Sequence, residues 1–174
     1  MIVLSRVFLT LIVSFSIATS SLHAQEHVKF EIKNAGMTVE GSFPVFESTV
    51  KYDPENVAAS SFVGTIKTSS ISTGIDMRDE HLVGDEYFDS AKYPNMTFKS
   101  TSVSKQSNGD LLVKGKFTIK ETSKVITLKV KPVKSGDTWW FETSFTFDRL
   151  DYEVGESSWV LSDDVTCFIK ASAD

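Results

Sequence analysis

The chain has 174 residues, with 18 Lys and Arg against 23 Asp and Glu and a formal net charge of −5. A net negative chain without a basic cluster is a poor binder of nucleic acid, and this length predicts one folded domain. Cys167 is the only cysteine, which excludes an intramolecular disulfide and a cysteine-based zinc cluster.

The first 24 residues are predicted to form a secretory signal peptide. Arg6 precedes an apolar run of 11 residues (7–17), which is too short to span a membrane, and small residues lead to Ala24. We expect cleavage after Ala24, a periplasmic or secreted location, and a single domain over residues 25–174. The 150 residues that remain carry a formal charge of −6, because Arg6 is removed. No later apolar run reaches spanning length, so no integral membrane span is expected.

The sequence after the signal segment begins with β-strand patterns. Val28, Phe30 and Ile32 alternate with charged residues, and this period of two predicts a half-buried strand. Residues 39–52 form a long extended run. Pro44 lies inside that run and predicts a kink or an edge position, because proline cannot donate to a strand ladder.

Asp53 and Pro54 are expected to begin a short helical turn that ends near Ala59. Alternating strand patterns continue beyond it, and Asn108-Gly109 is typical of a hairpin turn. These later strands are expected over residues 62–71, 95–103, 111–119, 126–131, 139–147 and 165–169. The total is about eight strands, mostly antiparallel.

Strands with one apolar and one polar face leave exposed edges unless the sheet closes. We therefore expect an all-β fold, an extended eight-stranded antiparallel barrel, although a two-sheet sandwich fits the same alternation. The interior of such a barrel can be filled by side chains or can hold one small ligand. Eighteen of the 150 residues after the signal segment are aromatic, and eleven of them are Phe. These rings either pack against one another or enclose an apolar molecule.

Successive side chains of a strand point to opposite faces of the sheet, so every second residue points inward; we call this rule strand parity. It places ten apolar side chains inside the expected barrel as candidate tunnel-lining residues. For each of them, contact with a ligand and packing in the core are equally good interpretations. The ten are Phe30, Phe46, Ile66, Phe98, Phe117, Ile119, Leu128, Phe141, Phe145 and Phe147.

Residues 72–94 break the strand pattern and predict one or two short helices. Thr73 and Asp76 fit a capping box at the start of a helix over residues 74–83. Gly84 suits the C-terminal end of this helix.

One face of the expected helix, on which Ile75 and Leu82 are expected to be buried, also carries the charged Arg78 and Asp79, at spacings of three and four. The charges are interpreted either as a network that ties the helix to nearby backbone or as a ligand site, in which Arg78 meets a polar or anionic head group at the barrel mouth. His81 and Arg149 are further candidates for the head group. Asp79 and His81 point about 200° apart on a helix, so we expect no metal site.

No arrangement typical of catalysis is evident. Adjacent carboxylates such as Asp163 and Asp164 point apart in a strand, unlike a glycosidase pair, and the chain has no nucleophile elbow. Cys167 shares the inward face of its expected strand with Val165 and Ile169, so it is expected to be a buried apolar residue rather than a nucleophile. We expect a binding protein that needs no cofactor. A lipid- or sugar-acting enzyme and a filled structural barrel are the alternatives.

Several motifs resemble the signature of the YceI-like family, and they cover nearly all of the chain after residue 25. Tyr87 departs from the pattern, because it replaces one of a Phe pair. The central motifs are Ser72-Thr73-Gly74, Arg78-Asp79-x-His81-Leu82, Phe88-Asp89 and Tyr93-Pro94-x-x-x-Phe98. They are flanked by Gly115-x-Phe117-x-Ile119 and Arg149-x-Asp151-Tyr152.

This resemblance implies a lipocalin-like barrel and a secreted or periplasmic protein. It implies a tunnel that binds a long isoprenoid or other amphiphilic lipid, such as a polyprenyl phosphate, a quinone or a fatty-acid derivative. Transport, storage or sequestration of that lipid would be the role. Some members are dimers, so the resemblance also implies a possible homodimer. A structural or stress-response barrel without a ligand remains the alternative.

Overall fold

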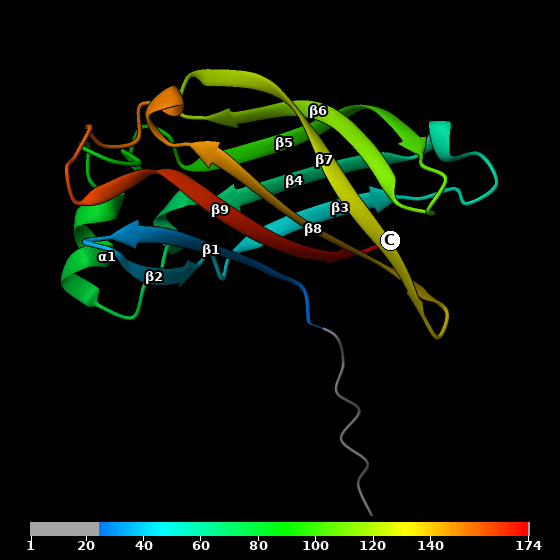
Figure 1. Cartoon of the computed structure of the whole chain (residues 1–174), viewed down its shortest axis with the longest axis horizontal. Coiled ribbons are helices and arrows are strands. Elements are labelled where there is room, and N and C mark those ends of the chain that lie inside the picture. The colour runs from blue at the N-terminus through cyan, green and yellow to red at the C-terminus, as the bar shows by residue number, and fades with distance from the viewer. Residues whose placement is uncertain (1–24, 174) are drawn as a thin grey trace, which may run out of the picture.

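The structure is a computed structural model in which residues 25–173 are described (Figure 1). The predicted signal segment, residues 1–24, lies outside the described residues. The elements are, in chain order, β1 (His27–Asn34), β2 (Met37–Ser42), β3 (Phe46–Lys51), η1 (Val57–Ala59), β4 (Ser61–Lys67), η2 (Thr68–Ser70), α1 (Asp76–Val83), β5 (Asn95–Lys105), β6 (Leu111–Ile119), β7 (Thr122–Ser135), β8 (Thr138–Asp148), η3 (Leu150–Tyr152) and β9 (Leu161–Ser172).

The strands form one antiparallel sheet that curls around a long axis (Figure 1). Their order is β2-β1-β9-β8-β7-β6-β5-β4-β3, which makes β2 and β3 the two edges. The predicted all-β, antiparallel, lipocalin-like architecture is confirmed. The predicted number of eight strands is wrong, because the run over residues 39–52 is divided around Pro44. Pro44 has no N–H to donate, and the chain passes there from one edge of the sheet to the other.

The edge strand β3 meets the β1–β9 side of the curled sheet through side chains. Glu26, just before β1, accepts hydrogen bonds from the backbone N–H of Ser172 at 2.8 Å and from its hydroxyl at 2.7 Å. The same carboxylate oxygen accepts a hydrogen bond from the hydroxyl of Ser48 in β3 at 3.5 Å. We call this junction of Glu26, Ser48 and Ser172 the seam. The seam joins β3 to the β1–β9 side of the sheet without a strand ladder.

Strand alternation directs the apolar side chains into the curl, where they form two clusters. One cluster surrounds Ile119 and Tyr152 near the end that carries α1, and the other surrounds Leu111 and Val113 towards the opposite end. Phe145 packs against both clusters. Figure 1 shows α1 at the end of the sheet where β1 and β8 finish and β9 begins. The interior is therefore elongated, with the helix at one end.

The start of α1 differs from the predicted capping box. The helix begins at Asp76 and ends at Val83, its N-cap residue Ile75 makes no side-chain capping bond, and Ile75 is 53% exposed. The carboxylate of Asp79 instead accepts the backbone N–H of Thr73 at 2.9 and 3.1 Å, and also the Thr73 hydroxyl. The positive φ of Gly74, 78°, turns the chain before the helix. The predicted partner Asp76 and the predicted burial of Ile75 were therefore wrong.

The other predicted helix signals have mixed outcomes. Gly84 is the C-cap residue of α1, as predicted. Asp53 accepts the backbone N–H groups of Glu55 and Asn56 at 3.0 and 2.9 Å, as a capping aspartate does. The helical turn itself is shorter than predicted, because η1 covers only Val57–Ala59.

Replacement of Asp79 with alanine is expected to lower the free energy of unfolding by about 1–2 kcal/mol, because the bonds to Thr73 at the entry of α1 are lost. Asp76→Ala is the matched control, and it should cause less than half of that loss. Urea denaturation monitored by circular dichroism measures both. A loss for Asp76→Ala as large as for Asp79→Ala would contradict the structural assignment.

Candidate functional site

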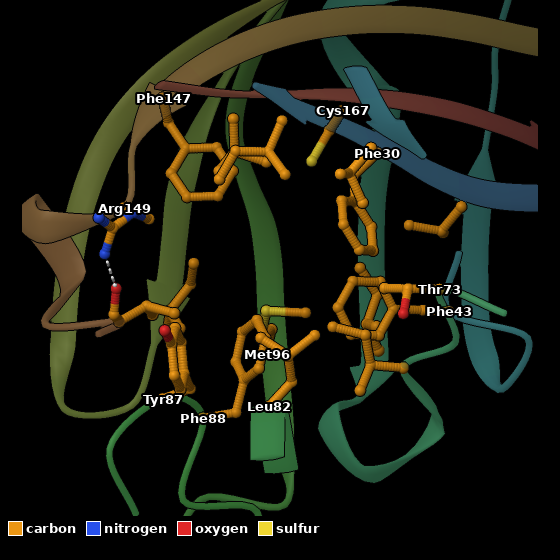
Figure 2. Close-up of a pocket in the computed structure, with 18 of the residues that line it drawn as sticks. Phe30, Phe43, Thr73, Leu82, Tyr87, Phe88, Met96, Phe147, Arg149 and Cys167 are labelled. Carbon is orange, nitrogen blue, oxygen red and sulfur yellow. Dashed lines mark hydrogen bonds between the residues drawn. The ribbon is translucent and has the colours of Figure 1, made fainter. Parts of the chain in front are cut away.

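An interior cavity of about 250 Å³ lies at the end of the curled sheet that carries α1. Figure 2 shows its wall, with Phe30, Met96 and Cys167 from the strands and Leu82 and Phe88 from α1 and the segment after it. The wall is almost entirely apolar, apart from the side chains at the α1 end. We call this space the proximal cavity.

A second interior cavity of about 100 Å³ lies further along the sheet, away from α1. We call it the distal cavity. The two cavities have five wall residues in common: Val28, Ile66, Phe117, Phe145 and Ile169. We call these five residues the shared wall, in which the rings of Phe117 and Phe145 are edge-to-face with centroids 5.6 Å apart. The two cavities are therefore neighbours that adjoin at the shared wall.

An aromatic group borders the distal cavity on the side away from α1. The ring of Tyr52 lies 5.2 Å from Trp139 and 5.1 Å from Phe141, measured between centroids. Phe62 contacts Phe141 edge-to-face at 5.1 Å. These four residues form the end group, and their mutual packing fills this end of the curl.

All ten predicted tunnel residues line one or both cavities; their contact with a ligand stays a prediction. Those of the proximal cavity alone are Phe30, Ile119 and Phe147, those of the distal cavity alone are Phe46, Phe98, Leu128 and Phe141, and those of both are Ile66, Phe117 and Phe145.

The ten residues differ in burial, and the difference separates packing from possible ligand contact. Half of them are buried in the clusters: Phe30, Phe117, Ile119, Leu128 and Phe141. The others point inward but are only half-buried: Phe46, Ile66, Phe98, Phe145 and Phe147. An inward ring that keeps accessible surface faces empty space rather than neighbouring atoms. These half-buried side chains are the ones that a ligand would cover.

Several wall residues were missed by strand parity, because they lie between strands. Phe43 follows β2, and its ring lies 5.5 Å from Phe30 and 5.8 Å from Phe88 between centroids. Tyr87 and Phe88 lie in the segment after α1 (Figure 2). The available signal was their aromatic character within segments that showed no strand pattern. The wall also contains Cys167. Strand parity predicted that Cys167 points inward, but the residue was not among the ten candidate ligand contacts.

Arg149 lies in the wall of the proximal cavity and is 2% exposed (Figure 2). Its Nε–H donates to the carbonyl of Ser162 at 3.0 Å, and Nη1 donates to the carbonyl of Val154 at 2.8 Å. Nη2 donates to the carbonyl of Glu156 at 2.7 Å and to Asp163 Oδ1 at 3.1 Å. Four of the five guanidinium N–H groups are thus used to hold the segment after β8 against β9. A role for Arg149 in binding a head group stays a prediction.

Arg78 and His81 lie at the α1 end of the proximal cavity. Arg78 is half-buried, and it donates from Nε to the hydroxyl of Thr73 at 2.7 Å and from Nη2 to the Thr73 carbonyl at 3.0 Å. These bonds tie the helix to nearby backbone, which is the structural interpretation of this charge. Nη1 of Arg78 has no hydrogen-bond partner among residues 25–173. His81 is exposed and pairs with Glu86 at 2.6 Å. Arg78 therefore has a structural role, lies in the cavity wall and keeps one donor group without a bond to any of the residues 25–173.

The thiol of Cys167 lies in the wall of the proximal cavity and is buried. Burial raises the pKa of Cys167 to about 12, so its thiol stays protonated at neutral pH and acts as an apolar wall residue.

Within residues 25–173, no three His, Cys, Asp or Glu side chains come together in a group that could hold a metal ion. In the same part of the chain, no helix has the length and apolar character needed to cross a membrane.

Comparison with known proteins gives concordant matches. The family described as "YceI-like domain" matches residues 20–173. A "UPF0312 protein" of Vibrio cholerae is 34% identical over 127 residues, which are 72% of this chain and 66% of that protein. The chain therefore aligns with just under two thirds of the length of this relative.

Two solved structures have the same fold. The crystal structure of BcnA from Burkholderia cenocepacia matches with a TM-score of 0.82 and 28% identity, over 86% of this chain and 96% of that one. A structure described as a polyisoprenoid binding domain from Saccharophagus degradans matches with a TM-score of 0.66 and 15% identity, over 84% and 92% of the two chains. At that identity, the second match bears on the fold alone.

Proposed function

Because the chain belongs to the YceI-like family, we propose that it binds the apolar tail of a long isoprenoid or another amphiphilic lipid inside its curled sheet. The observation that carries the proposal is the set of inward but half-buried rings described above. Phe98, Phe145 and Phe147 are examples: each lines a cavity and keeps accessible surface, which a bound tail would cover.

Burial of the tail would supply the free energy of binding. Apolar surface removed from water contributes about 25 cal/mol per Å² before the losses of association. A tail enclosed on all sides therefore needs no specific polar contact to bind. The absence of polar groups from most of the wall also means that a saturated, branched or polyunsaturated tail is accepted on shape alone.

We propose that the head group lies at the α1 end, where the cavity wall carries its charged side chains. Nη1 of Arg78 is the donor that a phosphate, carboxylate or quinone oxygen would meet first, with His81 at the rim. Arg149 lies deeper, with most of its donors already bonded. We expect the head group to contribute orientation more than affinity.

We place this function outside the cytoplasm, after removal of the predicted signal segment over residues 1–24. The protein would transport, store or sequester its lipid there, as a monomer or a homodimer.

Extraction of the purified protein under denaturing conditions, followed by mass spectrometry, tests the proposal. We expect an amphiphile with a long apolar tail at a ratio of lipid to protein well above that of an unrelated β-rich protein purified in parallel. A fluorescent polyprenyl probe should also bind to the delipidated protein. The proposal is wrong if no amphiphile co-purifies and the probe is not taken up.

A further inference from the structure

Gly64 lies in the middle of β4 and faces the distal cavity. It pairs with Ser48 of β3 and with Phe98 of β5, in the inward register of its strand neighbours Phe62 and Ile66. A Cβ atom built on Gly64 would meet no heavy atom within 4 Å. The packing of the protein therefore leaves room at this position for a side chain that the sequence does not provide.

Two other inward glycines lack a side chain for a reason that Gly64 does not share. A Cβ on Gly41 would lie 2.2 Å from Cζ of Phe30, and a Cβ on Gly115 would lie 2.4 Å from Cζ of Phe98. Aromatic rings thus pack directly over those two backbones. Gly64 is also absent from the residues with a positive φ, so its backbone conformation does not require glycine.

A glycine in a strand interior weakens the strand, and where it has no conformational role it marks a close approach of another group. At Gly64 no protein atom makes that approach. The open position lies instead on the distal cavity, which adjoins the proximal cavity across the shared wall. Three members of that wall, Ile66, Phe145 and Ile169, are only half-buried, so they have space on the cavity side in which to change rotamer.

We propose that Gly64 sets the length of the tail that this protein accepts. The proposal rests on the proposed function and deepens it. A tail enters at the α1 end, fills the proximal cavity, displaces the side chains of the shared wall and ends in the distal cavity against the bare backbone of Gly64. The end group of Tyr52, Phe62, Trp139 and Phe141 bounds the space beyond. Any side chain at residue 64 therefore shortens the space open to the tail.

A chain-length series tests this role directly. We would measure the affinities of geranyl, farnesyl, geranylgeranyl and solanesyl diphosphate for the delipidated wild type and for Gly64→Ala, Gly64→Val and Gly64→Phe. The affinity of the wild type should keep rising up to a longer tail than the affinity of the variants does. Each methylene excluded lowers the affinity about fourfold, so Gly64→Phe should bind solanesyl diphosphate about tenfold or more weakly. Its affinity for geranyl diphosphate should be unchanged.

The control is Thr65→Phe, which adds the same ring on the outer face of β4 and should leave the whole series unchanged. Thermal unfolding of each variant checks that the fold is retained, as the open space at Gly64 leads us to expect. The role of Gly64 is overturned if Gly64→Phe follows the wild-type length dependence, or if it weakens short and long tails equally. If the wild type binds none of the four diphosphates, the proposed isoprenoid-binding function fails first and the role of Gly64 falls with it.

Discussion

Replacement of Arg149 with methionine is expected to lower the free energy of unfolding by about 3–5 kcal/mol. The methionine fills much of the same volume, but it leaves the carbonyls of Val154, Glu156 and Ser162 without their donor. It also removes the partner of Asp163. Because Arg149 is 2% exposed, water cannot replace these bonds without opening the segment after β8. Equilibrium unfolding in urea measures the loss.

Arg78→Met is the matched control for this experiment. Arg78 also lies in the wall of the proximal cavity, but it is half-buried and both of its bonds go to Thr73. We expect a loss of stability less than half of that for Arg149→Met. Arg149→Lys should fail to restore stability, because an ammonium group cannot make the planar fork of bonds. Equal losses for the two methionine variants would show that Arg149 has no special structural role.

Replacement of Phe117 with alanine is also expected to lower the free energy of unfolding by about 3–5 kcal/mol. Phe117 is 6% exposed, and its ring lies 5.4–5.6 Å from Phe145, Phe147 and Tyr152 between centroids. The variant loses these contacts and leaves a cavity that the surrounding strands cannot close. Urea denaturation gives the change in stability.

Phe46→Ala is the comparison that separates packing from ligand contact. Phe46 points into the distal cavity from the edge strand β3 and is only half-buried. Its loss should lower stability about half as much as the loss of Phe117, because fewer protein contacts disappear. It should also weaken the binding of solanesyl diphosphate several-fold, since the ring offers surface to the tail. The division of the Phe residues into two classes is wrong if Phe46→Ala destabilises as much as Phe117→Ala and leaves affinity unchanged.

The alternation of side chains along the regular strands identified their inward positions from the sequence. The period of two is imposed by the backbone, so the inward positions of a regular strand follow once its phase is known. Phe117 and Ile119 in β6, and Phe145 and Phe147 in β8, are cases in which the phase was set by a clean alternation. The break in the strand pattern over residues 72–94 predicted the helical segment between β4 and β5, and the family motifs agreed with both assignments.

The features that sequence reasoning missed depend on contacts between distant segments. Phe43 reaches the cavity because the chain leaves β2 beside β1, where its N–H donates to the carbonyl of Val28 at 3.0 Å. Tyr87 and Phe88 reach it because the segment after α1 folds back across the end of the sheet. The local alternation of apolar and polar residues does not indicate either of these contacts. The choice of Asp79 over Asp76 at the start of α1 depends likewise on the turn at Gly74, which the sequence spacing does not reveal.

The seam affects the width of the ligand that the curled sheet can enclose. In a closed barrel, the number of strands and their stagger fix the diameter, so a bulkier guest requires that ladder hydrogen bonds break. Here the circumference is interrupted between β3 and the β1–β9 side, and Glu26 with Ser48 and Ser172 holds it there. Ser48 lies in the wall of the distal cavity. Lengthening of the weak bond between Ser48 and Glu26 would therefore widen this cavity. If the proposed tail is bound, its length would be limited by the backbone of Gly64 and the rings of the end group, and its thickness by the seam.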